Sequence, residues 1–429
     1  MRRVAAIELR RPALLLGWGL LVAGQLWLML TDIAEWRGIW PMASAAVGAP
    51  WAFLGPAAAG LSAYDAVRRP RPAVETLGWR TVSSAMLVAR MILVAGVVAV
   101  GAAFAGLVTL ASDAPDGGLW GSYLTVTLAF AVWSVALGML VGSFGGPSWF
   151  PPVVALLVAF LRGVWFQGAG PESPGAAFTR VFLAGRPWHE LDPVAVIAAV
   201  AEAALLLIVA LGAPVLAARI RGCFAGATFA PHRAGVVLGV SVASMVVLCI
   251  GVVLTSPPIV RDRTAPPVIP CTDTLPQVCV WPEHASLLPA LAETTSRAQR
   301  VSQAVEGSLM SRIDEFGLGD EVTFVAVGQG TWFLSDTLAG TIAGSLAPVR
   351  CDSPESDPQV AVYFAARSEV SALLQLEIED EVWPAGYGNS LGVDRTEVAR
   401  VWRAPAAERD AWVDDRVALM RESVEMWCG

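Results

Sequence analysis

Two charged residues lie within long apolar stretches of this chain, where an ionisable group needs a partner. Arg162 comes near the end of the apolar stretch 150–166, and Glu202 comes deeper within the stretch 194–217. Arg90 and Arg162 are close enough to helix ends for their side chains to extend towards the interface. A carboxylate in lipid is costly unless it faces a neighbouring helix, a cavity or a partner. We therefore expect Arg162 and Glu202 to form an intramembrane polar pair. It serves either as part of a transport path or as a pin between helices, and we favour the pin.

The motifs that would make this chain an enzyme are weak. Gly388–Gly392 (GNSLG) matches the G-x-S-x-G motif, with Ser390 as the nucleophile. That motif requires a strand before it and a histidine after it, but WPAGY precedes it and the last histidine is His284. His284, beside Glu283, is a candidate metal ligand or general base, although the chain has no H-E-x-x-H motif. We interpret His284 as a polar residue at a turn.

The basic residues exclude two further kinds of chemistry. All 29 of them are arginine, so the chain has no lysine for a phosphate-binding P-loop or for a Schiff base. The formal net charge of −8 also argues against binding to nucleic acid. We expect no enzymatic activity, no cofactor and no metal in this chain.

Cysteines are concentrated towards the C-terminus. Four of the six, Cys271, Cys279, Cys351 and Cys428, follow residue 255. An even set in a small region indicates two disulfides, provided that the compartment is oxidising. Cys271 and Cys279 are close enough to close a small loop, and Cys351 with Cys428 would then hold the C-terminus. The other pairings stay open at this point.

The elements that position these residues are mostly apolar. The chain has 429 residues, of which 55% are hydrophobic and 15% charged, which is typical of a polytopic membrane protein. We expect a transmembrane domain over residues 1–256, a proline-rich linker at 257–270 and a disulfide-bonded domain at 271–429. The seven predicted spans lie near 13–30, 42–63, 86–110, 121–141, 150–166, 194–217 and 235–255.

Arginine positions set the orientation. With the N-terminus inside, the inner segments hold eleven arginines: Arg2, Arg3, Arg10, Arg11, Arg68, Arg69, Arg71, Arg80, Arg219, Arg221 and Arg233. The short outer loops hold Arg37, Arg180 and Arg186. Seven spans then place the C-terminal domain outside the cell membrane, where disulfides form. Small residues at Ser134, Gly138 and Gly142 have the spacing of close helix contacts, although the abundance of glycine and alanine explains them equally well.

The region after residue 260 has the pattern of a helix-rich α+β domain. Leu287–Phe316 has helical spacing of apolar residues, and Glu321–Val327 is expected to be a strand. Asp336 is expected to cap a helix through Leu346. A helix is also expected from Pro358 towards Ile378, with a strand at 360–364 as the alternative. Asp394 and Glu397 form a capping box for a helix through Trp402, and 406–427 is a final amphipathic helix.

Several segments resemble a known family. Glu8-Leu9-Arg10-Arg11 (ELRR) before the first span, and Ala63–Arg80 (AYDAVRRPRPAVETLGWR) between spans two and three, are similar to export-type ABC transporter permeases of high-GC Gram-positive bacteria. The non-spanning apolar piece Ala176–Ala184 resembles the re-entrant hairpin of that family. The stretch Cys279–His284 and the helix after it are similar to the extracellular tail of such permease-like proteins. The seventh span and the large outer domain depart from the simplest six-span permeases.

The resemblance implies a role and partners. It predicts a membrane α-helical bundle that acts as the permease-like subunit of an ABC-type exporter, with a separate cytoplasmic ATPase and assembly as a homodimer or heterodimer. In that family the loop between spans two and three contacts the ATPase, which makes Arg68, Arg69, Arg71 and Glu75 the candidate coupling residues. The positive-inside rule alone explains the arginines equally well. The alternative is a non-transporting receptor or anchor that presents an extracellular binding domain.

Overall fold

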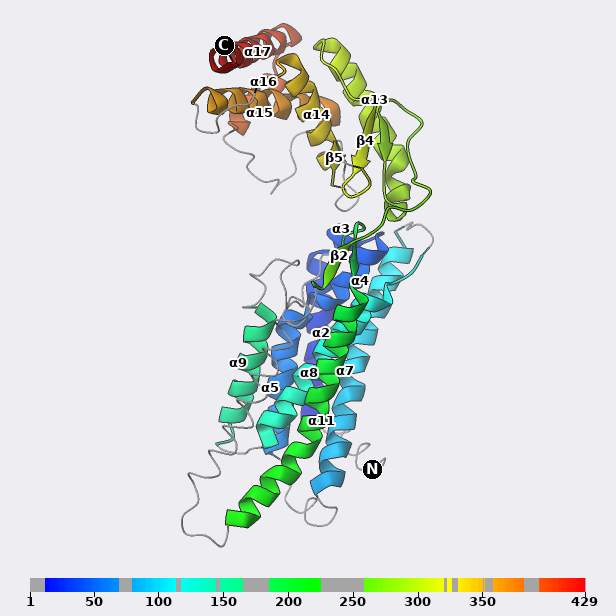
Figure 1. Cartoon of the computed structure of the whole chain (residues 1–429), viewed down its shortest axis with the longest axis vertical. Coiled ribbons are helices and arrows are strands. Elements are labelled where there is room, and N and C mark those ends of the chain that lie inside the picture. Colours follow the sequence, from blue (N-terminus) through cyan, green and yellow to red (C-terminus); the bar gives the residue numbers. More distant parts are fainter. Residues whose placement is uncertain are drawn as a thin grey trace. The chain divides into compact units, whose positions relative to one another are not determined.

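The computed structural model divides the chain into two compact units, Met1–Arg263 and Thr264–Gly429. Both are mostly helical (Figure 1). The structure describes residues 12–68, 79–112, 117–143, 147–164, 185–224, 258–319, 322–325, 331–349, 351, 358–381 and 393–428. The division falls within the predicted linker 257–270. Residues up to Arg263 belong to the first unit.

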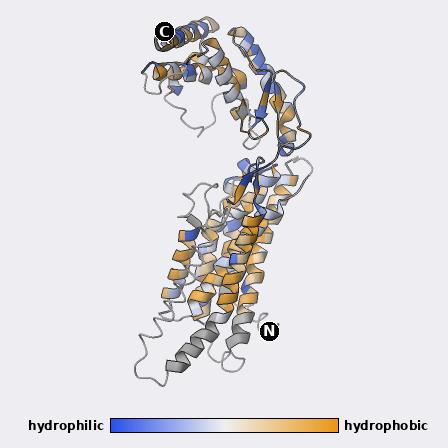
Figure 2. Ribbon diagram, viewed as in Figure 1, coloured by the Kyte–Doolittle hydropathy of each residue, from blue (hydrophilic) through white to orange (hydrophobic). Residues whose placement is uncertain are grey.

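The first unit is a bundle of apolar helices that run alternately up and down (Figure 1). Figure 2 shows their predominantly hydrophobic colouring. The helices are α2 (Pro12–Thr31), α3 (Ile33–Trp36), α4 (Trp40–Gly48), α5 (Trp51–Val67), α7 (Trp79–Leu110), α8 (Gly121–Ser143), α9 (Phe150–Val164) and α11 (Pro193–Phe224). Two short strands, β1 (His189–Leu191) and β2 (Val260–Asp262), complete the unit.

Three of the described helices are long and apolar enough to cross a membrane. Their qualifying segments are Ala85–Leu110, Gly121–Ser143 and Pro193–Gly212, and two shorter apolar helices cover Leu15–Thr31 and Phe150–Arg162. The seventh predicted span, 235–255, and the predicted re-entrant piece, 176–184, lie outside the described residues. The structure thus supports a helical membrane protein, while the count of seven spans stays a prediction.

The second predicted span, 42–63, is divided in the structure. Helix α4 ends at Gly48 and α5 begins at Trp51, so one continuous helix was the wrong expectation. Pro50 lies between them and has no N–H to donate to a preceding carbonyl, which interrupts the helical hydrogen bonds. The interruption places Trp51 and the first turn of α5 beside α4.

Helices α5 and α8 pack closely through small residues. A Cβ at Gly138 would overlap the carbonyl oxygen of Ala59, and one at Gly142 would lie 2.7 Å from the carbonyl oxygen of Ala63. The backbones approach because glycine presents no side chain there. The small-residue spacing in α8 therefore marks a real helix contact, which fixes the register of α8 against α5.

The second unit combines helices with a three-stranded sheet. Its strands β3 (Gln277–Cys279), β4 (Arg312–Glu315) and β5 (Thr323–Phe324) are parallel in the order β3-β4-β5. The helices are the 3-10 helix η2 (Pro282–Leu287) and the α-helices α13 (Leu288–Ala304), α14 (Trp332–Leu346), α15 (Pro358–Glu379), α16 (Arg395–Trp402) and α17 (Ala406–Cys428). Figure 2 shows the mixed colouring of this unit, in which apolar and polar faces alternate.

Helix α13 ends earlier than its pattern predicts. The expectation of one helix over 287–316 is wrong, because α13 ends at Ala304 and β4 occupies Arg312–Glu315. Glu306 adopts a positive φ of 54°, and the Gly307 amide then donates 2.9 Å to the Ser302 carbonyl. This left-handed turn caps the helix and redirects the chain into the sheet, where Ile313 is fully buried.

The start of α14 also differs from the prediction. Asp336 lies inside the helix and does not cap it, because α14 begins at Trp332 with Thr331 in the N-cap position. A tertiary contact fixes that earlier start: the Thr331 hydroxyl donates 3.0 Å to the Glu379 carboxylate of α15. Helix α15 covers the segment 360–364, so the helical alternative for that segment is the correct one.

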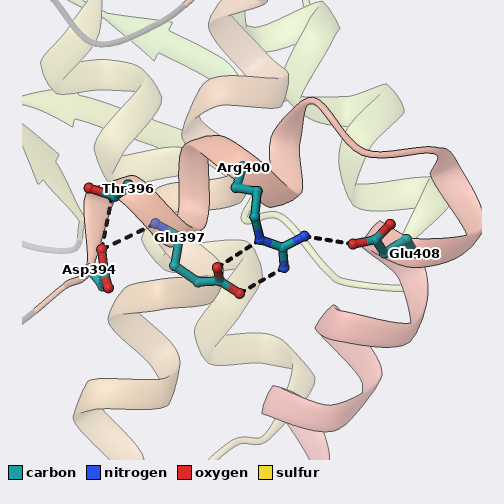
Figure 3. A network of polar contacts seen from close by, with 5 residues as sticks. All are labelled: Asp394, Thr396, Glu397, Arg400 and Glu408. Carbon is teal, nitrogen blue, oxygen red and sulfur yellow. Dashed lines mark hydrogen bonds and ion pairs between the residues drawn. The ribbon is translucent and has the colours of Figure 1, made fainter.

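Helix α16 begins at the predicted cap. The Asp394 carboxylate accepts hydrogen bonds from the amides of Thr396 (3.0 Å) and Glu397 (3.1 Å), as an N-cap residue does (Figure 3). The Glu397 side chain does not return to the cap. It accepts two hydrogen bonds from Arg400, at 2.8 and 2.9 Å, and these lower the pKa of Glu397. Arg400 also donates to Glu408 (2.7 Å), which joins α16 to α17.

Candidate functional site

The structure brings Arg162 of α9 and Glu202 of α11 into direct contact. Both terminal nitrogens of Arg162 donate to the Glu202 carboxylate, Nη1 to Oε1 and Nη2 to Oε2, each at 2.7 Å. The two side chains are 13% and 15% exposed. A two-pronged contact of this kind is the strongest ordinary arginine–carboxylate geometry.

The pair crosses one face of α8. Helix α9 packs against α5 and α8, whereas α11 packs against α8 and α7. The Arg162 guanidinium lies 4.0 Å from the ring centre of Trp133 and 5.6 Å from that of Phe130, both on α8. Aromatic faces attract a cation. The two rings of α8 therefore stabilise the guanidinium, while the Glu202 carboxylate neutralises its charge. The arrangement connects helices α8, α9 and α11, as expected for a pair that holds helices together.

A second buried arginine has a partner that the sequence did not reveal. The sequence suggested that Arg90 of α7 lies near a helix end and extends towards the interface. Instead, Arg90 is buried within the bundle, at 1% exposed. Its Nη2 donates 3.0 Å to Oδ2 of Asp65 on α5. Asp65 was missed because it lies in the stretch assigned to the start of the inner loop. Two arginine–carboxylate pairs therefore connect helices within the bundle.

The candidate coupling residues are only partly within the described chain. Arg68 directly follows α5, is exposed, and lies with its guanidinium 4.3 Å from the ring centre of Tyr64. Arg69, Arg71 and Glu75 lie outside the described residues. The geometry thus places one accessible arginine at this end of α5.

The opposite end of the bundle carries the β1–β2 pair. These strands are antiparallel, with Glu190 opposite Arg261, and the Arg263 amide donates 2.9 Å to the carbonyl of Trp188. Ile259 is fully buried in a cluster with Tyr123 at the start of α8 and with Ala195 at the start of α11. Residues 258–263 are consequently docked against the N-terminal end of α11.

The four C-terminal cysteines form two pairs. Cys271 bonds to Cys279 across eight residues, and Cys351 bonds to Cys428 across 77 residues. The first pair closes the loop before β3. The second attaches the end of α17 to the segment that follows α14. Both bonds constrain the second unit alone.

His284, on η2, has a buried partner on strand β4. Its Nδ1 lies 2.7 Å from Oε1 of Glu315 on β4, and both side chains are fully buried. Oε2 of the same carboxylate accepts 3.0 Å from the Trp281 amide. The sequence pointed to Glu283, its neighbour, because strand pairing is not visible in residue spacing. The pair connects η2 with the sheet, which is a structural role.

The candidate metal ligands and the candidate nucleophile are not brought together in the described parts of the chain. Across these ranges, no three His, Cys, Asp or Glu side chains gather into a group that can hold a metal ion. Ser390, the nucleophile of the G-x-S-x-G match, lies outside the described residues.

Comparison with protein-family models, with curated proteins and with solved structures finds no match to this chain.

Proposed function

We propose that this chain is the membrane-spanning, permease-like subunit of an ABC-type export system that relies on a separate ATPase chain. Its C-terminal unit, Thr264–Gly429, is then an extracytoplasmic domain. One observation supports the proposal most directly. The exposed Arg68 lies at one end of the bundle, and strand β2, which precedes the second unit in the chain, lies at the other end.

The length of α11 supports this topology. A helix of 32 residues is about 48 Å long, which exceeds the roughly 30 Å of the hydrocarbon core. Helix α11 ends at Phe224. Ile259, which precedes β2, packs at the opposite, N-terminal end of α11. The segment between them connects opposite ends of the helix. The seventh span that we predict at 235–255 would make that connection, and it would put Arg263 on the side of the loop before α11.

The disulfides and the arginines support the same orientation. Two disulfide bonds in the second unit favour an oxidising compartment outside the cytoplasm. Arg68 would then face the cytoplasm, where positively charged loops are enriched and where an ATPase is located. In the resembled family this loop contacts the ATPase, and the chain forms a homodimer or heterodimer.

A second candidate is a non-transporting anchor or receptor that presents the outer domain. The observation that favours it is the pairing of charges inside the bundle. Arg162 with Glu202 and Arg90 with Asp65 fix helices against one another, as in a static scaffold. In this case the helices need no ATPase, and a ligand of the second unit defines the function.

Labelling of single cysteines tests the topology. In a chain with Cys223→Ser and Cys249→Ser, Thr264→Cys should react with a membrane-impermeant maleimide in intact cells. Arg68→Cys should react only after lysis. Both positions are exposed, so access to the reagent decides the outcome. Reaction of Arg68→Cys in intact cells would contradict the proposed orientation.

Purification in a mild detergent separates the two candidate functions. The exporter predicts that a protein with a P-loop co-purifies with the full chain, and that Arg68→Glu releases most of it. Arg261→Glu is a matched control, because Arg261 is an exposed arginine at the opposite end. Purification of the intact chain without any such ATPase would favour the anchor.

A further inference from the structure

A pocket of about 270 Å³ lies at the end of the bundle that carries β1 and β2. Its wall is formed by the last turns of α2, by α3, by α4 and by the first turn of α5. Leu28, Met29, Met42 and several alanines make most of this wall apolar. The volume is at the small end of the range of ligand pockets, and the pocket therefore fits a small molecule.

The charged groups of this wall are of one sign. Asp32 and Glu35 both line the pocket, and among the described residues no basic side chain does. Within the described ranges neither carboxylate forms an ion pair, in contrast to Glu190 at the same end, which pairs with Arg261. An apolar pocket with two carboxylates that form no ion pair favours an organic cation that also carries an apolar group.

Two aromatic side chains complete the recognition chemistry. Trp36 and Phe53 line the pocket together with the carboxylates. Trp36 is held in place because its Nε1 donates 3.1 Å to the carbonyl of Met29. Below the wall, buried Gln25 donates to the carbonyl of Val47 and contacts the Met29 sulfur at 3.3 Å. Aromatic faces beside carboxylates are the usual surroundings of bound quaternary ammonium groups.

We propose that this pocket is a binding site for a small organic monocation with an apolar body. The carboxylates of Asp32 and Glu35 attract the cationic group, with the exposed Phe53 in the same wall, and the apolar body fills the pocket towards Leu28 and Met42. The site does not depend on the exporter assignment, because binding is a property of the chain alone.

The test uses the full chain in dodecyl maltoside, a detergent without an ammonium group. Benzyltrimethylammonium is the probe, and its binding is measured by equilibrium dialysis. The proposal predicts saturable binding that Asp32→Asn with Glu35→Gln weakens at least tenfold. The matched control, Glu190→Gln with Asp262→Asn, removes the same charge at the same end outside the pocket and should leave the affinity unchanged.

Three outcomes would overturn the proposal. Equal binding to the Asp32→Asn, Glu35→Gln variant would show that the carboxylates are not involved. Equal weakening by the control variant would indicate a general surface potential. Displacement by dihexanoyl phosphocholine at concentrations well below those of the probe would identify a lipid headgroup as the occupant. A second variant, Phe53→Ala, should weaken the probe while leaving both carboxylates in place.

Discussion

Removal of the Glu202 carboxylate should destabilise the helical unit far more than removal of an exposed charge. The substitution Glu202→Leu leaves the Arg162 guanidinium without its anion among apolar helices. The side chain still contacts Trp133 of α8, but a ring face replaces only a small part of a full negative charge.

The size of the effect follows from the burial of the pair. Both side chains are at least 85% buried within the bundle, and breaking a buried ion pair from one side costs about 3–5 kcal/mol. For a unit of this size, 1 kcal/mol shifts Tm by about 2–4 °C. We therefore expect Glu202→Leu to lower Tm by about 6–20 °C.

Thermal unfolding of the full chain in detergent measures this effect, with the retained monodisperse fraction as the readout. The double variant Arg162→Leu, Glu202→Leu removes both charges and should recover most of the loss, because an apolar pair of similar volume replaces the ion pair. Glu190→Gln is the control. It breaks an exposed pair with Arg261, where we expect about 0–1 kcal/mol.

The double variant decides whether the reasoning is correct. If Arg162→Leu and Glu202→Leu each lower Tm and the double variant lowers it by their sum, the two residues are not coupled. The pin is then refuted. If stability recovers but a measured export activity does not, the pair belongs to the transport path that the sequence left as an alternative.

Three further variants test the second unit. Glu315→Ala should cost about 3–5 kcal/mol in chemical unfolding, because it leaves His284 buried without its partner. Cys428→Ser should cost about 4.5 kcal/mol, from the entropy of a 77-residue loop, and should abolish the mobility shift between reduced and non-reduced samples. Burial raises the pKa of Asp336, so its ionisation opposes folding. The folded protein has its full stability at pH values below the pKa of Asp336 in the unfolded chain, and part of it is lost as pH rises through the raised pKa of the folded state. Asp336→Asn should therefore raise Tm slightly at pH 7 and leave Tm unchanged near pH 2.

The sequence predicts the elements of the bundle well because each apolar helix carries its own signal. Helices α2, α8 and α9 begin and end within a few residues of the expected spans. The division of the second span at Pro50 was missed, because the hydrophobic stretch 42–63 continues across it. Pro50 lies inside that stretch, and its missing N–H interrupts the helix.

Partners across the bundle are harder to predict than helices. The Arg162–Glu202 pair was accessible because each residue is a lone charge in an apolar stretch. Asp65 lies two residues beyond the predicted span 42–63, and its pairing with Arg90 depends on how α5 and α7 are arranged in the bundle. The same holds for His284 and Glu315, which are brought together by the parallel pairing of β3 with β4. Sequence spacing carries no information on such contacts.

The distribution of charge in the bundle connects these contacts with function. Arg162 neutralises Glu202, and Arg90 neutralises Asp65, so these pairs add no net charge between the helices. Asp32 and Glu35 differ, because within the described residues no basic group pairs with them. A cation that reaches the bundle therefore gains most at the pocket that they line. Whether the chain exports its ligand or only binds it, the pocket is where that ligand should first be sought.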